Sequence, residues 1–263
     1  CTSMILVFIL SLFLAQTPAP SPSVSIDEKS QQIIDRAVAT LGGEKYLNVQ
    51  TVIGRGFYST FKDGLSQIPA RFLDYIAYPD RERTEFVGAG IRTIQTNVGD
   101  TGWVFDGAVK KISDQTPAQV EDFKRAMKTG LEYLLRGNWK KDGGKVTYVG
   151  RREAGVGKRN EAIRLTDPSG FWIEYEFGAR DGLPAKVIYK RMRKDPDTGD
   201  MVEMTEEDQL LKFIEVDGVT APWVVDHFIN GKQVSRINYE SVQYNQKFPD
   251  NLFAKPDNVK AIK

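Results

Sequence analysis

Hydrophobic and polar residues alternate with a period of two along most of the chain. In "FWIEYEF", residues 171–177, the apolar side chains at every second position share one face, and Glu174 and Glu176 share the other. This pattern is typical of a half-buried antiparallel strand. Between such stretches recur residue pairs that favour tight hairpin turns: Asp63-Gly64, Asp106-Gly107, Asp217-Gly218 and Asn230-Gly231. Residues 49–245 are therefore predicted to form a meander of antiparallel strands.

Residues 25–43 have the helical period instead. Ser25 is a possible N-cap and Gly42 is placed to end the helix. One face of this helix carries an apolar stripe: Ile33, Ile34, Ala37, Val38 and Leu41. A helix with one apolar face predicts packing against the sheet.

A second helix, over residues 116–137, interrupts the strands. Thr116 and Gln119 have the spacing of a capping box, Gly137 ends the segment, and Gly130 is placed to divide it. Its apolar residues lie on one side: Val120, Phe123, Met127, Leu131, Leu134 and Leu135. We expect this side to cover the concave face of the sheet.

The first residues have another composition. "MILVFILSLFLA", residues 4–15, is too short for a membrane-spanning helix and fits the core of a secretory signal, and the Pro/Ser-rich "QTPAPSPS" follows it. Residues 1–24 are predicted to be a signal peptide and linker, and an uncleaved membrane anchor is the alternative. Export of a chain with one cysteine, Cys1, favours the periplasm. The sequence leaves the cleavage site, the true N-terminus and the oligomeric state open.

Charge and metal-binding residues exclude several classes of function. The 36 Lys and Arg residues nearly balance the 35 Asp and Glu residues, so the overall charge does not favour a nucleic-acid partner. "AGVGKRN", residues 154–160, lacks the Ser or Thr that a phosphate-binding loop requires after its lysine. His227 is the only histidine, so a zinc site has too few ligands. We expect no metal, no cofactor and no catalytic residue.

Two other features have both a structural and a functional interpretation. His227 follows Trp223 and Val225 on one face of a predicted strand, which favours a histidine packed in the core or lumen. Glu174 and Glu176 lie about 7 Å apart if the strand is extended, within the range of glycosidase carboxylate pairs. Charged residues are also expected on the outer face of a strand, and this structural interpretation is favoured.

The order of elements resembles the LolA/LolB-like family of outer-membrane lipoprotein-sorting proteins. Four stretches carry this resemblance: "ATLGG" 39–43, "GDTGWVFDG" 99–107, "FIEVDGVTAPWVV" 213–225 and "NQKFPDNLFAKP" 245–256. It implies a mainly β fold with a few helices, an open, curved antiparallel half-barrel lidded by helices. Residues 25–255 would form this single domain, followed by a tail over 256–263.

The resemblance also implies a function. The expected protein is a non-catalytic periplasmic binding protein that holds a lipid, a lipoprotein acyl chain or another hydrophobic ligand in its lumen. The candidate ligand-binding residues are Phe57, Phe72, Trp103, Phe105, Leu131 and Trp223. Two alternatives stay open: a carboxylate-dependent hydrolase acting on an envelope polymer, and a scaffold that binds another envelope protein. The identity of the ligand cannot be derived from the sequence.

Overall fold

The computed structural model describes residues 24–195 and 198–262. Most of the predicted signal peptide and linker, residues 1–23, lies outside the described residues. Within the described part, no helix combines the length and apolar character needed to cross a membrane.

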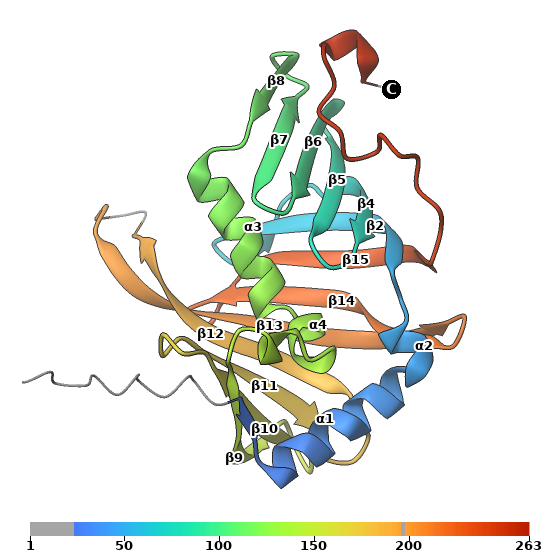
Figure 1. Cartoon of the computed structure of the whole chain (residues 1–263). Coiled ribbons are helices and arrows are strands. Elements are labelled where there is room, and N and C mark those ends of the chain that lie inside the picture. The colour runs from blue at the N-terminus through green and yellow to red at the C-terminus, as the bar shows by residue number, and fades with distance from the viewer. Residues whose placement is uncertain (1–23, 196–197, 263) are drawn as a thin grey trace, which may run out of the picture.

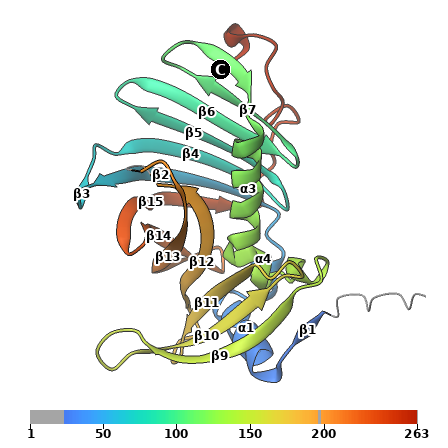
Figure 2. The ribbon, with the colours of Figure 1, turned by 90° about the vertical axis from the view of Figure 1, so that its left-hand side faces the viewer.

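Fifteen strands form one sheet, which is wound in space and does not close into a barrel (Figures 1 and 2). The order of neighbouring strands is β1-β9-β10-β11-β12-β13-β14-β15-β2-β4-β5-β6-β7-β8, and β3 pairs with β2. The strands of the first half of the chain are β1 (Ser25–Ile26), β2 (Thr51–Lys62), β3 (Leu65–Ser66), β4 (Ala70–Ala77), β5 (Arg81–Gly88), β6 (Ile91–Val98), β7 (Thr101–Asp106) and β8 (Lys111–Asp114). Those of the second half are β9 (Lys145–Glu153), β10 (Arg159–Thr166), β11 (Trp172–Gly178), β12 (Pro184–Lys194), β13 (Met201–Val216), β14 (Val219–Ile229) and β15 (Lys232–Tyr244). The predicted open, curved antiparallel architecture is confirmed.

One pair of strands departs from the predicted pattern. β1 runs parallel to β9, with Ser25 opposite Lys145. Ser25 is therefore part of a strand and not the N-cap of the first helix. The cap is Asp27, whose carboxylate accepts from Ser30 N at 2.8 Å.

The helices gather on one face of the sheet. They are α1 (Glu28–Leu41), α2 (Glu44–Leu47), α3 (Pro117–Thr129) and α4 (Leu131–Leu135), with a short 3-10 turn at Asn138–Lys140. Another 3-10 turn, Val259–Ala261, lies in the C-terminal segment. Thr116 and Gln119 form the predicted capping box at the start of α3. Gly130 has the extended angles φ −63° and ψ 153°, which interrupts the helix between α3 and α4 as its position suggested. α3 itself runs across successive strands of the sheet (Figures 1 and 2).

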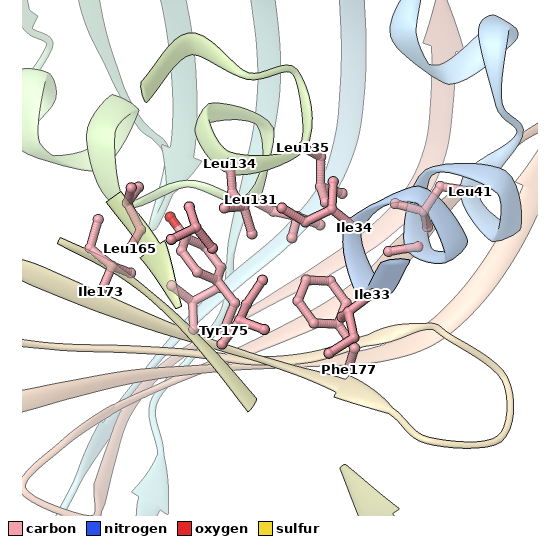
Figure 3. Close-up of a cluster of buried hydrophobic side chains, with 14 of the residues drawn as sticks. Ile33, Ile34, Leu41, Leu131, Leu134, Leu135, Leu165, Ile173, Tyr175 and Phe177 are labelled. Carbon is pink, nitrogen blue, oxygen red and sulfur yellow. The ribbon is translucent and has the colours of Figure 1, made fainter. Parts of the chain in front are cut away.

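The main core lies where α1 and α4 pack on strands β9–β12. Figure 3 shows Ile34 of α1 beside Leu135 of α4, and Ile33 beside Phe177 of β11. Leu131 and Leu134 of α4 lie above Tyr175 of β11. Tyr175 is fully buried, and Leu134 is 1% exposed. The α1 stripe and the Leu131–Leu135 part of the second stripe thus bury against the sheet as their spacing predicts, and they fix α4 in place.

A second, smaller core lies on the other face of the sheet. It holds Ile94, Trp103 and Phe105, and Val259 and Ile262 of the C-terminal segment pack against it. The Trp103 indole donates to Phe253 O at 3.0 Å. In Figure 1 this red C-terminal segment and α3 lie on opposite sides of β5–β7. This C-terminal segment therefore covers the sheet, because its apolar side chains find buried partners there.

Candidate functional site

A cavity of about 270 Å³ lies between the α3–α4 junction and the face of the sheet that these helices cover. Strands from both halves of the sheet contribute to its wall, together with α2 and α4. The apolar lining residues are Val49, Val52, Ile76, Leu131, Val187, Leu210, Val219, Ala221, Pro222, Val225 and Val242. The polar lining residues are Tyr46, Asp74, Tyr78, Thr129, Glu132, Arg136, Asp208, Tyr239 and Tyr244. An apolar wall with a few polar groups is the usual character of a small-molecule site.

Arg136, directly after α4, holds one side of the cavity together. Its guanidinium donates to Val49 O at 2.7 Å and to Tyr46 O at 3.3 Å. The same group lies 4.1 Å from the ring centroid of Tyr78, a cation–π contact. Arg136 thus fastens α4 to the segment between α1 and β2.

Asp74 is a carboxyl group that is nine-tenths buried in the cavity wall. Its Oδ1 accepts from Thr84 Oγ1 at 2.8 Å. Burial raises the pKa of Asp74 to about 7, because a low-dielectric site disfavours the charged form more than the hydrogen bonds favour it. Burial, and then the charge of Asp74, likewise raise the pKa of Glu82 on the neighbouring strand to about 8. Both acids favour the protonated form in the folded protein.

The stability of the protein should therefore fall as the pH rises from the usual Asp range near 3.8 through about 7. In this window the unfolded chain has released the Asp74 proton and the folded chain retains it, so ionisation favours unfolding. Each pKa unit corresponds to about 1.4 kcal/mol, so the rise in pKa from 3.8 to about 7 gives an expected loss on the order of 4 kcal/mol from this residue. Urea denaturation at several pH values measures the slope. Asp74→Asn should flatten it, whereas Asp63→Asn, in an exposed turn, should leave it unchanged; an unaltered slope in Asp74→Asn would contradict the assignment.

A polar network continues from the cavity beneath α3. Glu206 of β13 accepts from Tyr189 at 2.7 Å and from Arg193 at 2.8 Å, and it also pairs with Arg191. Burial opposes the ionisation of Glu206, but the hydrogen bonds from these three side chains lower its pKa overall. Arg191 also pairs with Asp122 of α3 at 2.8 Å. The network holds α3 against the sheet.

His227 belongs to the edge of this network and is not packed among apolar side chains. Its Nδ1 lies 2.6 Å from Asp208 Oδ1, and its Nε2 lies 3.7 Å from Glu206 Oε2. The sequence suggested a histidine packed in the core or lumen. The structure places His227 beside carboxylates of the neighbouring strand, and one of them, Asp208, lines the cavity. Within residues 24–195 and 198–262, no group of three or more His, Cys, Asp or Glu side chains could hold a metal ion.

Glu174 and Glu176 lie on the face of β11 opposite to Tyr175 and the main core. Both carboxylates pair with Arg152, and Glu174 also pairs with Arg164. Their side chains are 4% and 5% exposed, so the outer face here is buried beneath arginine side chains and not solvated as expected. Neither residue lines the cavity. The geometry is that of a structural ion-pair network.

The structure does not bring the six predicted ligand-binding residues together. Leu131 lines the cavity, and the Phe72 ring contacts Tyr239, which also lines it, with 5.4 Å between ring centroids. The other four lie outside the cavity lining: Phe57, Trp103, Phe105 and Trp223. For Phe57, Trp103 and Phe105, the sequence showed that strand faces alternate but not which face the helices cover. Trp223 shares the covered face of β14 with Ala221 and Val225 but lies outside the lining. A ligand contact at these four residues stays a prediction.

Trp103 and Phe57 are on the face away from the cavity. On β2, Val52 and Gly54 line the cavity, so Phe57 points to the opposite face, where Arg71 lies 5.3 Å from its ring centroid. Trp103 is 4% exposed and lies beneath the C-terminal segment. Sequence reasoning missed the charged and tyrosine side chains of the cavity. They come from five separate elements and two connecting segments and share no motif.

Trp103→Ala should separate packing from ligand binding. We expect it to lower the free energy of unfolding by about 3 kcal/mol, because truncating a packed aromatic residue leaves a cavity. The affinity for any ligand of the main cavity should stay the same, since Trp103 faces the C-terminal segment. Denaturant unfolding and ligand titration of the same variant provide the test, and a loss of affinity without a loss of stability would restore Trp103 as a binding residue.

Comparisons with known proteins support the fold. No family model and no curated relative matches the chain. Among solved structures, a DUF1329 family protein from Desulfovibrio piger has a TM-score of 0.57 at 13% identity, over 85% of this chain and 96% of that one. A putative outer membrane lipoprotein-sorting protein domain from Vibrio parahaemolyticus has a TM-score of 0.54 at 12% identity, over 87% and 97%. A LolA superfamily protein from Nitrosomonas europaea has a TM-score of 0.53 at 14% identity, over 86% and 97%. The fold is LolA-like, as the resemblance in the sequence implied.

Proposed function

We propose that the protein is a non-catalytic periplasmic binding protein that holds a lipid, a lipoprotein acyl chain or another hydrophobic ligand between α4 and the sheet. The observation that carries this proposal is the cavity of about 270 Å³, in which eleven of the 22 lining residues are Val, Leu, Ile, Ala or Pro. Removing one CH₂ group from water contributes about 0.8 kcal/mol, so an alkyl chain can bind there without a reacting group. Proteins with the same fold include one described as a lipoprotein-sorting domain, which supports this class of ligand.

The periplasmic location is part of the proposal. The apolar stretch at residues 4–15 and the Pro/Ser-rich segment after it have the composition of a secretory signal. The carboxylates that suggested a hydrolase are held by arginines away from the cavity, which supports binding over catalysis.

A substitution that fills the cavity with a larger side chain tests whether the cavity binds a hydrophobic ligand. Leu210 and Leu211 are adjacent on β13, but Leu210 lines the cavity and Leu211 is 38% exposed. Leu210→Phe should weaken the binding of an alkyl ligand such as decanol at least ten-fold, because the larger ring occupies the space of the chain. Leu211→Phe, the same substitution on the other face, should leave affinity unchanged.

Titration calorimetry with both variants gives the affinities, and denaturant unfolding reports any overpacking, which typically costs about 1–3 kcal/mol. Native mass spectrometry of protein purified from a membrane-bearing host should also show a bound hydrophobic molecule. If the wild-type protein binds no alkyl ligand, or if both variants bind equally well, the cavity is not a lipid site.

A further inference from the structure

Glu132 of α4 is a charged group of the cavity that has no partner. It is half-buried, it lines the cavity, and it makes no hydrogen bond or ion pair with the described residues. Tyrosine side chains surround it: burial, and then the charge of Glu132, raise the pKa of Tyr46 and of Tyr78 well above the usual value. An unpaired carboxylate beside an apolar wall is costly unless a ligand or solvent compensates its charge.

The nearest cation within the same helix does not neutralise this carboxylate. Arg136 follows Glu132 by four residues, a spacing at which opposite charges commonly pair. Instead, the guanidinium donates to the backbone carbonyls of Val49 and Tyr46 and stacks on the ring of Tyr78. Arg136 is thus committed to holding α4 in place, and the charge of Glu132 stays available to a ligand.

A second, independent group in the same wall also lacks a partner. Tyr46 is 6% exposed, and its hydroxyl has no hydrogen-bond partner in the described structure. Tyr46 lines the cavity together with Glu132. A buried hydroxyl without a partner is destabilising, so a ligand that donates a hydrogen bond to it would be favoured.

The charged and aromatic side chains that line the cavity favour a cationic ligand group. Apart from Asp74, which favours the protonated form, the charged residues that line the cavity are the carboxylates Glu132 and Asp208 and the guanidinium of Arg136. Four tyrosine rings line it as well, and the face of an aromatic ring attracts a cation. A hydrocarbon chain suits the apolar side of the cavity, and an ammonium group suits this side.

We propose that the cavity binds an amphiphile whose hydrocarbon chain carries a protonated amine, with the ammonium group placed between Glu132 and the Tyr46 hydroxyl. This inference rests on the proposed function, since it names the class of head group that the same cavity selects. Glu132 and Tyr46 would accept hydrogen bonds from the ammonium group, while the valines and Leu210 contact the chain.

The test compares ligands of one chain length that differ in the head group: decylamine, decanol and decanoate, each below its micellar concentration at pH 7. Titration calorimetry measures each affinity for the wild-type protein and for Glu132→Gln. The matched control is Glu121→Gln on α3, which makes the same change in net charge at a side chain that is 63% exposed. Thermal unfolding confirms that each variant is folded.

In the wild-type protein, decylamine should bind at least ten-fold more tightly than decanol, and decanoate should bind most weakly. Glu132→Gln should reduce the preference for decylamine over decanol to less than three-fold and leave the affinity for decanol unchanged, whereas Glu121→Gln should retain the preference. Equal affinities for decylamine and decanol, a preference for decanoate, or a preference that survives in Glu132→Gln would overturn the amine inference while the hydrophobic site stands. If none of the three binds, the proposed function fails with it.

Discussion

Leu134→Asp should unfold the protein or leave it with an exposed apolar surface that binds a hydrophobic dye. Leu134 is 1% exposed, and it points from α4 into the core that α1 shares with the sheet (Figure 3). The substitution removes a packed apolar side chain and places a carboxylate among apolar residues that offer no partner. We expect a loss of more than about 5 kcal/mol, at the exceptional end for one substitution.

The measurements are denaturant unfolding and the fluorescence of an apolar dye. Leu65→Asp makes the same chemical change at a side chain that is 71% exposed, and it should alter neither. If Leu134→Asp keeps wild-type stability and binds no dye, α4 does not seal the core.

Gly56→Ala should separate the two halves of the sheet. β2 and β15 form the pairing that joins strands β9–β15 to strands β4–β8. A Cβ at Gly56 would lie 2.0 Å from Asn238 O, next to a register shift at Tyr239/Ser241, so the strands would have to move apart. A glycine in the interior of a strand often marks such a close backbone approach. We expect a loss of more than about 4 kcal/mol, because the ladder hydrogen bonds of the junction are disrupted together.

Gly88→Ala is the matched control, since the nearest neighbour of its Cβ is the Ala70 side chain at 3.2 Å. It should change stability by less than about 1 kcal/mol. Hydrogen exchange in Gly56→Ala should accelerate first in β2 and β15. Retained protection of those amides would show that the junction tolerates the methyl group.

Local chemistry made the hairpins and helix ends predictable from the sequence. Asp217-Gly218 has φ values of 55° and 81°, and Asn230-Gly231 has 49° and 76°. These left-handed angles are those of the tight turns that both pairs favour. The capping box of α3 and the break at Gly130 likewise depend on residues a few positions apart. Such features need no knowledge of the distant chain.

The sequence did not predict which segments and side chains cover each face of the sheet. Alternation places Trp103 and Phe105 on one face of β7, but only the path of the C-terminal segment decides what covers them. Glu174 lies opposite to the core as the pattern implies, yet Arg152 from β9 buries it. The cavity joins Glu132 to Tyr46 and Tyr239, residues of distant segments that meet only through the strand order. Long-range pairing thus determines the site, whereas spacing in the sequence determines the elements.

The unclosed sheet has a consequence for self-association. A sheet with two exposed edge strands presents unpaired backbone groups that can pair with a strand from another molecule. Here the strand order ends in the two-residue β1 and the four-residue β8, and β8 carries Lys111 and Asp114 at its ends. β8 is short and its charges disfavour its burial, but β1 covers only Lys145 and Val146 of the nine-residue β9, so the rest of β9 is an open edge among the described residues. Self-association by strand addition is therefore expected at β9 and not at β8.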